Sequence, residues 1–183
     1  MNIKLIDIQK DDIELIRNWR NSKDVSKYMY NDSIITQEQQ ENWFKYIQNS
    51  STSKYWLIEY DNVKIGVVNL TGIDNTLQSC YWAFYLGEIS NRGAGIGGKI
   101  EYTILDYVFN TLKLNKLRCE VFVSNEKVIK MHEKFGFRRE AYYREHCIKG
   151  NEKLDVVGLA ILRSEWEQIQ PILKKKVYDP NKS

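Results

Sequence analysis

The chain has 183 residues, of which 43% are hydrophobic and 28% are charged, and its formal net charge is +3. These values are typical of one folded domain and exclude a disordered or collagen-like chain. They also exclude a strongly basic surface for nucleic acid, because the charge is mild and Lys and Arg form no long stripe. No run of about 18 apolar residues occurs, so the sequence predicts no membrane span.

The cysteines and histidines indicate a reducing compartment and no metal. Cys80, Cys119 and Cys147 are odd in number and widely spaced, which favours buried, reduced thiols in a cytoplasmic protein. The chain has only two histidines, His132 and His146, and no C-x-x-C motif, so we expect no metal site. We also expect no nucleic-acid or membrane partner, and we leave a homodimer open.

Hydrophobic periodicity in the first half of the chain predicts two helices and several strands. Thr36, with Gln39 three residues later, has the spacing of a helix capping box. Asp61-Asn62 separates two strand-like runs and predicts a tight hairpin turn. In chain order, the expected elements are a strand at 3–8, a helix from 11, an irregular stretch at 21–35, a helix from 36, and strands at 54–60, 63–70 and 77–86.

The second half predicts a strand–helix–strand crossover and a final hairpin. Its elements are a glycine-rich loop at 91–98, a helix at 100–112, a strand at 116–123, a helix at 125–135, strands at 145–149 and 154–162, and a helix at 164–173. The crossover predicts a parallel strand pair, whereas the hairpins predict antiparallel pairs. The fold class is therefore α/β, or α+β, with a mixed sheet and helices on both faces. We expect a single domain at 1–170 and a C-terminal tail at 171–183.

The glycine-rich loop has the chemistry of a phosphate site. It follows a strand and precedes a helix, so its backbone N–H groups and the helix dipole can converge on an anion. A Walker loop is excluded, because Ile100 follows Lys99 where a hydroxyl residue is required. Gly93, Gly95 and Gly98 match the G-x-G-x-x-G fingerprint of dinucleotide binding. That fingerprint belongs early in a parallel βαβ unit, whereas this one lies in mid-chain after strands expected to be antiparallel. A turn that merely starts a helix remains the alternative at this point.

A second motif follows at residues 125–137, and the two motifs together resemble the GCN5-related N-acetyltransferase (GNAT) superfamily. The resemblance covers nearly the whole chain and includes the order of the elements. The residues that match are Arg92, Gly95 and Gly97 in the first motif, and Asn125, Met131, Gly136 and Phe137 in the second.

The resemblance implies acetyl-CoA as co-substrate, bound where two neighbouring parallel strands splay apart. The loop amides would hold its pyrophosphate, the end of the first splayed strand would pair with its pantetheine arm, and Asn125 would hydrogen-bond that arm. The cofactor-binding residues implied in this way are Tyr85, Leu86, Gly87, Arg92, Gly93, Ala94, Gly95, Ile96, Gly97, Gly98, Asn125 and His132.

The expected chemistry is direct attack of a neutral amine on the thioester. The chain departs from the family pattern at His132, which stands where the family usually has a Tyr beside the sulfur. An imidazole can also protonate a leaving thiolate, so His132 is the candidate general acid, and a helix histidine without a role is the alternative. Glu120, Glu145 or a water chain are the candidate bases.

The acceptor is indicated by the N-terminal third. Trp19-Arg20-Asn21 and the cluster at 28–30 resemble the RimJ/RimL-like branch, and within it acetyltransferases of UDP-linked 4-amino sugars of the pseudaminic acid type. An Arg suits a diphosphate and a Tyr suits stacking on a base or sugar. A ribosomal-protein N-terminal acetyltransferase, a polyamine acetyltransferase and a non-catalytic acetyl-CoA-binding module remain alternatives. The expected acceptor-binding residues are Arg20, Tyr28, Met29 and Tyr30.

Overall fold

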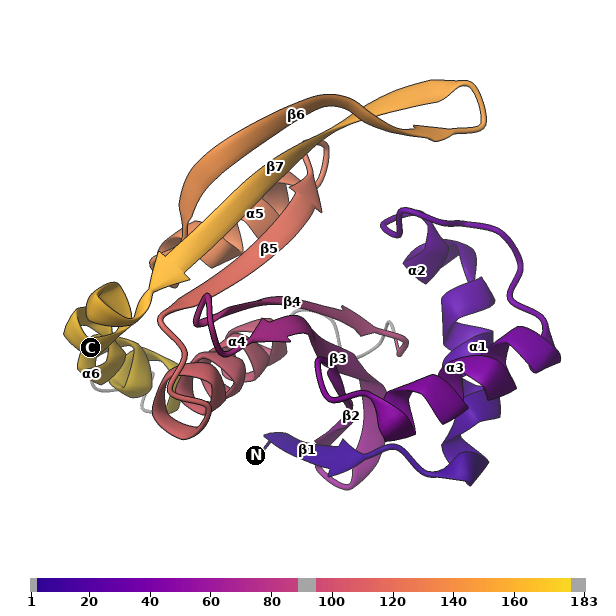
Figure 1. The fold of residues 1–183 in the computed structure, drawn as a ribbon, viewed down its shortest axis with the longest axis horizontal. Coiled ribbons are helices and arrows are strands. Elements are labelled where there is room, and N and C mark those ends of the chain that lie inside the picture. Colours follow the sequence, from indigo (N-terminus) through magenta and orange to yellow (C-terminus); the bar gives the residue numbers. More distant parts are fainter. Residues whose placement is uncertain (1–2, 89–94, 179–183) are drawn as a thin grey trace. The chain divides into compact units, whose positions relative to one another are not determined.

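The strands and helices follow one another along the chain nearly as the sequence predicts. The computed structural model describes residues 3–88 and 95–178, and these divide into two compact units (Figure 1). One unit combines the chain up to residue 73 with the segment that begins at residue 82; the other combines residues 74–81 with the rest of the chain. Among the described residues, the strand order is β1-β2-β3-β4-β5-β7-β6, and the fold is the mixed sheet that we expected.

The first unit is an antiparallel sheet with helices beside it (Figure 1). Its elements are β1 (Ile3–Asp7), the 3-10 turn η1 (Lys10–Asp12), α1 (Ile13–Asn21), α2 (Lys23–Ser26), α3 (Gln37–Asn49), β2 (Lys54–Tyr60), β3 (Val63–Asp74) and the later part of β4 (Ser79–Leu86).

Local sequence signals set two boundaries of this unit. The hydroxyl of Thr36 accepts a hydrogen bond from the Gln39 amide at 3.2 Å, and the Gln39 side chain accepts one from the Thr36 amide at 2.9 Å, so the predicted capping box starts α3. Asp61 and Asn62 both have positive φ, 48° and 65°, and β3 follows at once, as in a type I′ hairpin turn. Both predictions are confirmed.

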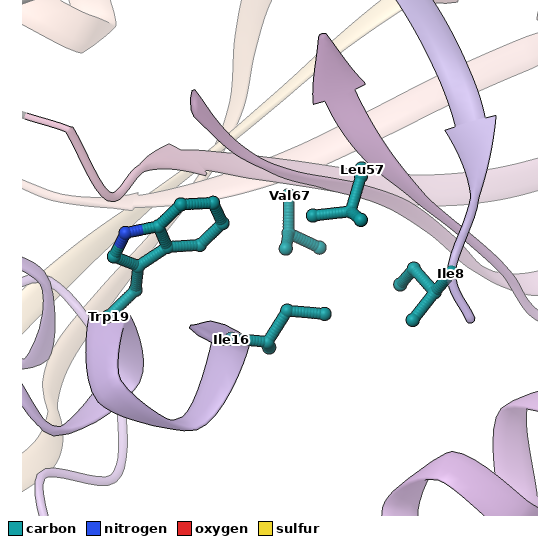
Figure 2. Close-up of a cluster of buried hydrophobic side chains, with 5 residues drawn as sticks. All are labelled: Ile8, Ile16, Trp19, Leu57 and Val67. Carbon is teal, nitrogen blue, oxygen red and sulfur yellow. The ribbon is translucent and has the colours of Figure 1, made fainter. Parts of the chain in front are cut away.

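The core of the first unit lies between α1 and the sheet. Ile16 and Trp19, three residues apart on one face of α1, pack with Leu57 from β2 and Val67 from β3, and Ile8 closes the cluster (Figure 2). All five side chains are buried. Burial of such side chains stabilises a fold by about 1.5–3 kcal/mol each, so this cluster fixes α1, which carries Arg20 at its end.

The second unit contains the parallel strand pair and the C-terminal hairpin, which Figure 1 shows as two long adjacent ribbons. Its elements are the start of β4, α4 (Ile96–Asp106), the π-helical turn η3 (Tyr107–Thr111), β5 (Lys116–Phe122), α5 (Glu126–Lys134), β6 (Arg138–Lys149), β7 (Glu152–Leu162) and α6 (Arg163–Tyr178).

Several elements differ in extent from the prediction. The short helix α2 lies in the stretch expected to be irregular, and α4 begins four residues before the expected start. Strand β6 begins at Arg138 rather than at 145, because both of its faces are largely exposed and leave no apolar alternation to read. Helix α6 continues through Pro171 to Tyr178, so most of the expected C-terminal tail is helical.

The parallel ladder between β4 and β5 is short. It joins residues 79–81 to residues 116–118, although β4 continues to Leu86 and β5 to Phe122. Arg118 strengthens this junction, because its Nη2 donates to the Ser79 hydroxyl at 3.1 Å and its guanidinium lies 4.2 Å from the centre of the Tyr81 ring. The crossover predicted from the sequence is therefore present as a parallel pair.

Cys80 and Cys119 are buried and Cys147 is half-buried, and all three are free thiols. Within residues 3–88 and 95–178, no helix combines the length and the apolar character that crossing a bilayer requires.

Candidate active site

A cavity of about 450 Å³ opens in the first unit beside α1 and α3. Arg20 from α1, Met29 from the following loop and Gln40 from α3 line it, and Asn69 and Tyr85 line it from the sheet. Its size is that of a small-molecule pocket. Arg20 and Met29 are two of the four residues that the sequence predicted for acceptor binding.

Two side-chain donors at this cavity have no hydrogen-bond partner among the described residues. They are Nη1 of Arg20 and Nε2 of Gln40, both fully buried atoms. The Gln40 side chain is buried to 3% exposure, and no Asp or Glu is among the described residues that line the cavity. A buried donor without an acceptor costs roughly 1–3 kcal/mol. The cavity is therefore suited to a ligand rich in acceptor oxygens rather than to a polycation.

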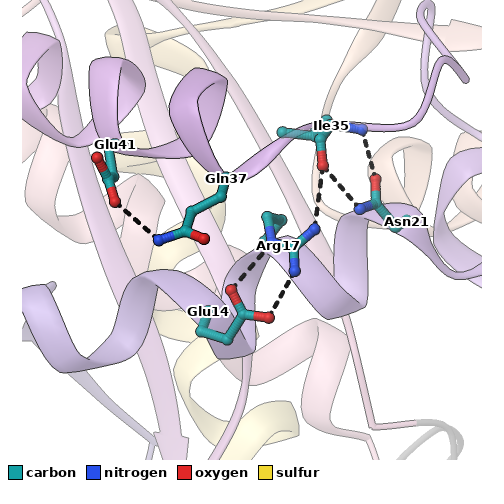
Figure 3. A network of polar contacts seen from close by, with 6 residues as sticks. All are labelled: Glu14, Arg17, Asn21, Ile35, Gln37 and Glu41. Atoms are coloured by element: carbon teal, nitrogen blue, oxygen red, sulfur yellow. Dashed lines mark hydrogen bonds and ion pairs between the residues drawn. The ribbon is translucent and has the colours of Figure 1, made fainter.

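The loop that carries Met29 is tied down at its far end by Asn21 (Figure 3). The Asn21 side chain donates to the Ile35 carbonyl at 3.0 Å and accepts from the Ile35 amide at 2.8 Å. Arg17 donates to the same carbonyl at 3.3 Å while its guanidinium pairs with Glu14. This network closes the segment between α1 and α3 into a fixed loop, which gives the cavity a stable wall.

The two predicted tyrosines lie outside the wall of the cavity. Tyr28 and Tyr30 are each 46% exposed and neither lines it. The ammonium of Lys27 lies 5.1 Å from the centre of the Tyr28 ring. Of the cluster at 28–30, the structure thus brings only Met29 to the cavity.

The N-terminus of α4 has the features of the predicted phosphate site. Gly95 is the N-cap residue with φ +71°, a left-handed conformation that favours glycine, and no atom of the other described residues beyond its chain neighbours lies within 4 Å of the position of a Cβ. The first turn of α4 holds no acidic residue, so its free amides and dipole favour an anion. These features fit a pyrophosphate. Arg92, Gly93 and Ala94, which belong to the same prediction, lie outside the described residues.

The other residues of this loop differ in what their side chains do. The Ile96 side chain is 1% exposed and belongs to the core, so only its backbone is available to a ligand. Gly98 faces the ring of Phe135, whose Cζ would lie 3.1 Å from an added Cβ. Gly97 sits with them in the first turn of α4. Close packing is therefore a second reason for a small residue at Gly98.

The predicted pantetheine contacts are spread over β4 and α5. Tyr85 and Leu86 end β4, and burial raises the pKa of the Tyr85 phenol, which keeps it neutral. The Gly87 amide donates to the Ile65 carbonyl of β3 at 2.9 Å, so that amide is already used within the first unit. Asn125 is the N-cap of α5, and its side chain makes no capping bond, which leaves its amide free of the helix.

His132 lies inside the second unit, buried to 3% exposure. Its Nδ1 is 2.7 Å from Oε1 of Glu101, a residue of α4 that is fully buried. The Cys119 thiol of β5 forms a further side-chain hydrogen bond with His132. Burial alone would lower the pKa of His132, but Cys119 and Glu101 outweigh it and raise that pKa to about 10. The Glu101 carboxylate beside Nδ1 favours the protonated form of the ring.

The two carboxylates considered as bases are less buried than this pair. Glu120 is half-buried on β5. Glu145 is exposed on β6, has a positive φ of 50° and pairs with Lys153 at 2.6 Å. The position of neither residue identifies it as the general base.

Two residues of the site were missed by sequence reasoning, Gln40 and Glu101. Both could have been recognised as buried, because each lies on the apolar face of its own helix, three and four positions from apolar residues. Gln40 precedes Trp43 and Phe44 by three and four residues, and Glu101 precedes Ile104 and Leu105 by the same steps. A polar residue in such a stripe is buried with the stripe.

The family model "Acetyltransferase (GNAT) domain" matches residues 2–138. The chain belongs to this family. It is 30% identical over 131 residues to acetyltransferase PseH of Campylobacter jejuni, which covers 72% of this chain and 80% of that protein. It is 24% identical to spermidine N(1)-acetyltransferase of Vibrio cholerae, over 87% of this chain and 92% of that protein.

Solved structures of the GNAT family agree with the fold. The spermidine N-acetyltransferase of Vibrio cholerae, in complex with CoA and spermine, superposes with a TM-score of 0.85 at 22% identity. The match covers 90% of this chain and 98% of that one. The protein is thus a GNAT N-acetyltransferase that uses acetyl-CoA.

Proposed function

We propose that this GNAT enzyme acetylates the amino group of a nucleotide-linked amino sugar, with the 4-amino group of a UDP-linked dideoxy sugar as the reacting amine. The observation that carries the proposal is the cavity of the first unit, whose described lining residues present the unpartnered donors of Arg20 and Gln40 and no carboxylate. A diphosphate and the oxygens of a base and sugar are acceptors for such donors.

The main alternative is a polyamine such as spermidine. A polyamine is a polycation, and its recognition requires carboxylates or other anionic groups close to it. The cavity offers a guanidinium instead, which repels a polycation. The likeness to spermidine acetyltransferases supports the fold, and the cavity chemistry favours the sugar nucleotide.

The second alternative is an N-terminal peptide of a ribosomal protein. Such a peptide would enter as an extended chain and would satisfy donors with its carbonyl oxygens. The resemblance of the N-terminal third to sugar-nucleotide acetyltransferases favours a small-molecule acceptor instead. The peptide therefore serves as a comparison in the assay below.

The chemistry assigned to this chain consists of binding, orientation and proton transfer. Acetyl-CoA supplies the thioester carbonyl that the amine attacks. The amides at the start of α4 would hold its pyrophosphate, and Asn125 its pantetheine arm. His132 would give a proton to the leaving thiolate, and solvent would take the proton that the amine loses. Holding both reactants in place supplies much of the rate.

The test is release of CoA in parallel assays with a UDP-4-amino sugar, spermidine and an N-terminal peptide. We expect turnover with the sugar nucleotide to exceed turnover with the other two by at least about 100-fold in kcat/KM, or about 2.7 kcal/mol. Arg20→Gln should raise KM for the sugar nucleotide and leave the affinity for acetyl-CoA unchanged. Lys27→Gln, a change of the same charge on the exposed side of the loop, is the control.

Three results would contradict the proposal. Preferred turnover of spermidine or of the peptide would assign a different amine. An Arg20→Gln variant with unchanged KM would remove the cavity from the argument. Binding of acetyl-CoA without turnover of any amine would indicate a non-catalytic acetyl-CoA-binding module.

A further inference from the structure

An aromatic pair lines the cavity of the first unit. Tyr55 of β2 and Trp43 of α3 both belong to its wall, and their rings meet edge to face with centres 5.4 Å apart and planes at 89°. Asn69 of β3 lines the same cavity. The Tyr55 side chain is half-buried, and the direction in which its hydroxyl donates decides what it offers to a ligand.

The two polar neighbours of the Tyr55 hydroxyl act as donors to it. The hydroxyl has side-chain hydrogen bonds with Trp43 and Asn69. An indole N–H can only donate. The Oδ1 atom of Asn69 already accepts from the Ala83 amide at 3.1 Å, which leaves the NH2 group of Asn69 for Tyr55. The Tyr55 oxygen is therefore the acceptor in both bonds, and neither bond uses its proton.

The Tyr55 proton is available to a ligand. Burial raises the pKa of Tyr55, and the bonds from Trp43 and Asn69 lower it, as donors to a phenol oxygen do. The net shift is upward, so the hydroxyl keeps its proton at neutral pH. Within residues 3–88 and 95–178, no group accepts a hydrogen bond from this hydroxyl. Tyr55 thus adds a neutral O–H donor to the wall of the cavity.

Two further donors of this cavity are unused. Nη1 of Arg20 and Nε2 of Gln40 are buried and have no partner among the described residues. Tyr85 relates Arg20 to Tyr55, because the guanidinium carbon of Arg20 lies 6.0 Å from the centre of the Tyr85 ring and Tyr55 acts electrostatically on the Tyr85 phenol. The cavity therefore offers three donors from α1, α3 and β2, and the donor from α1 carries a charge.

We infer that Tyr55 is a binding residue for the acceptor, whose hydroxyl donates to an oxygen of the diphosphate that Arg20 and Gln40 also bind. The inference rests on the proposed sugar-nucleotide acceptor and assigns its diphosphate to this wall of the cavity. Phosphate oxygens are charged and only accept, so they satisfy all three donors. An uncharged carbonyl would leave the charge of Arg20 uncompensated, and an ammonium group finds no acceptor in these three groups.

The first measurement is the binding of UDP, which carries the diphosphate but no amine that could react. We expect the wild type to bind UDP in calorimetry with CoA present. Tyr55→Phe, which removes only the hydroxyl, should bind UDP at least about tenfold more weakly. Uridine, which has no phosphate, should not distinguish the two proteins.

Tyr46→Phe is the matched control for this change. Tyr46 lies on α3, is 54% exposed and shares a hydrogen bond with Ser53 at 3.3 Å, and it is not among the residues that line the cavity. Its replacement removes the same atom outside the cavity, so binding of UDP should stay at the wild-type value.

The second measurement is steady-state kinetics with the sugar nucleotide. Tyr55→Phe should raise KM for the sugar nucleotide by about tenfold, with the affinity for acetyl-CoA unchanged. A hydroxyl that serves only packing would instead lower the thermal stability of the protein and leave this KM as it is.

The outcomes separate this inference from the proposed function. Unchanged binding of UDP in Tyr55→Phe overturns the inference, even where the sugar nucleotide remains the preferred substrate. An equal loss of UDP and uridine overturns it too, and so does a wild type that does not bind UDP. Preferred turnover of spermidine or of the peptide would refute the proposed acceptor, whereas the UDP measurement tests Tyr55 by itself. If Tyr55→Phe does not fold, Trp43→Phe removes one bond that orients the hydroxyl and should weaken UDP binding; unchanged binding would overturn the inference.

Discussion

The side-chain amide of Asn21 binds both backbone polar groups of Ile35, fourteen residues away, with bonds of 3.0 and 2.8 Å. This pair of bonds joins the end of α1 to the entrance of α3 and fixes the loop that carries Met29 (Figure 3). The relationship leads to a prediction about acceptor binding.

Asn21→Ala removes both bonds and leaves the Ile35 backbone groups to other partners. We expect the free energy of unfolding to fall by about 1–3 kcal/mol. KM for the acceptor should rise because the cavity loses a fixed wall, while the affinity for acetyl-CoA stays the same. Urea unfolding and steady-state kinetics measure the two effects. Asn18→Ala, on the exposed face of the same helix, should change neither the free energy of unfolding nor the acceptor KM. An equal rise of KM for the acceptor and for acetyl-CoA in Asn21→Ala would refute the specific role of the loop.

Gln40→Met should separate stability from function. It replaces a buried amide that has no partner for Nε2 with an apolar side chain of similar length. Removing an unsatisfied donor should raise the free energy of unfolding by about 1 kcal/mol. The same change should raise KM for the sugar nucleotide by about tenfold, if the ligand supplies the missing acceptor.

The matched control for this change is Gln37→Met. Gln37 lies one turn earlier on α3, is exposed and donates to Glu41 at 3.0 Å (Figure 3). Its replacement should leave the acceptor KM unchanged. A Gln40→Met variant that is less stable than the wild type, with normal kinetics, would show that Gln40 serves packing.

Gly95→Glu tests the phosphate site at the start of α4. The open space at its Cβ position admits a side chain, so the cost to folding is that of a left-handed residue, about 1–2 kcal/mol. The carboxylate should repel a pyrophosphate and abolish binding of acetyl-CoA in calorimetry. Gly95→Gln carries the same backbone cost without the charge and should bind at least about tenfold more tightly than Gly95→Glu. Equal affinities would place the pyrophosphate elsewhere.

The buried pair of Glu101 and His132 predicts how stability depends on pH. The raised pKa of His132 means that the folded protein holds a proton which the unfolded chain releases between its ordinary pKa of 6.5 and about 10. This contribution to the free energy of unfolding is therefore complete below pH 6.5 and is lost as the pH rises towards 10. Urea unfolding across this range should show the decline in the wild type and a smaller decline in Glu101→Gln. The same decline of the free energy of unfolding with pH in the wild type and in Glu101→Gln would contradict this prediction.

Signals that are local in sequence predicted much of the fold. Thr36 and Gln39 form their capping box within four residues, and Asp61-Asn62 sets a turn by its own backbone preference. Strand β6 was predicted too short, because an edge strand with both faces exposed has no apolar period.

In the site, too, residues that belong to local motifs were predicted, whereas a contact between distant residues was not. Arg20, Met29 and Gly95 come from motifs, and the structure places the first two at one cavity and the third at a helix N-terminus. The partner of His132 could not be predicted, since Glu101 lies 31 residues away and only packing brings the two together. A polar residue on an apolar helix face indicates burial, but the pattern does not say which group meets it.

The cavity has a consequence for how this enzyme can be altered. Every residue that lines it belongs to the first unit, whereas the start of α4 and the Glu101–His132 pair belong to the second. If the cavity binds the amine as proposed, replacing the stretch from α1 through α3 should change amine selectivity while leaving the residues of α4 and α5 untouched.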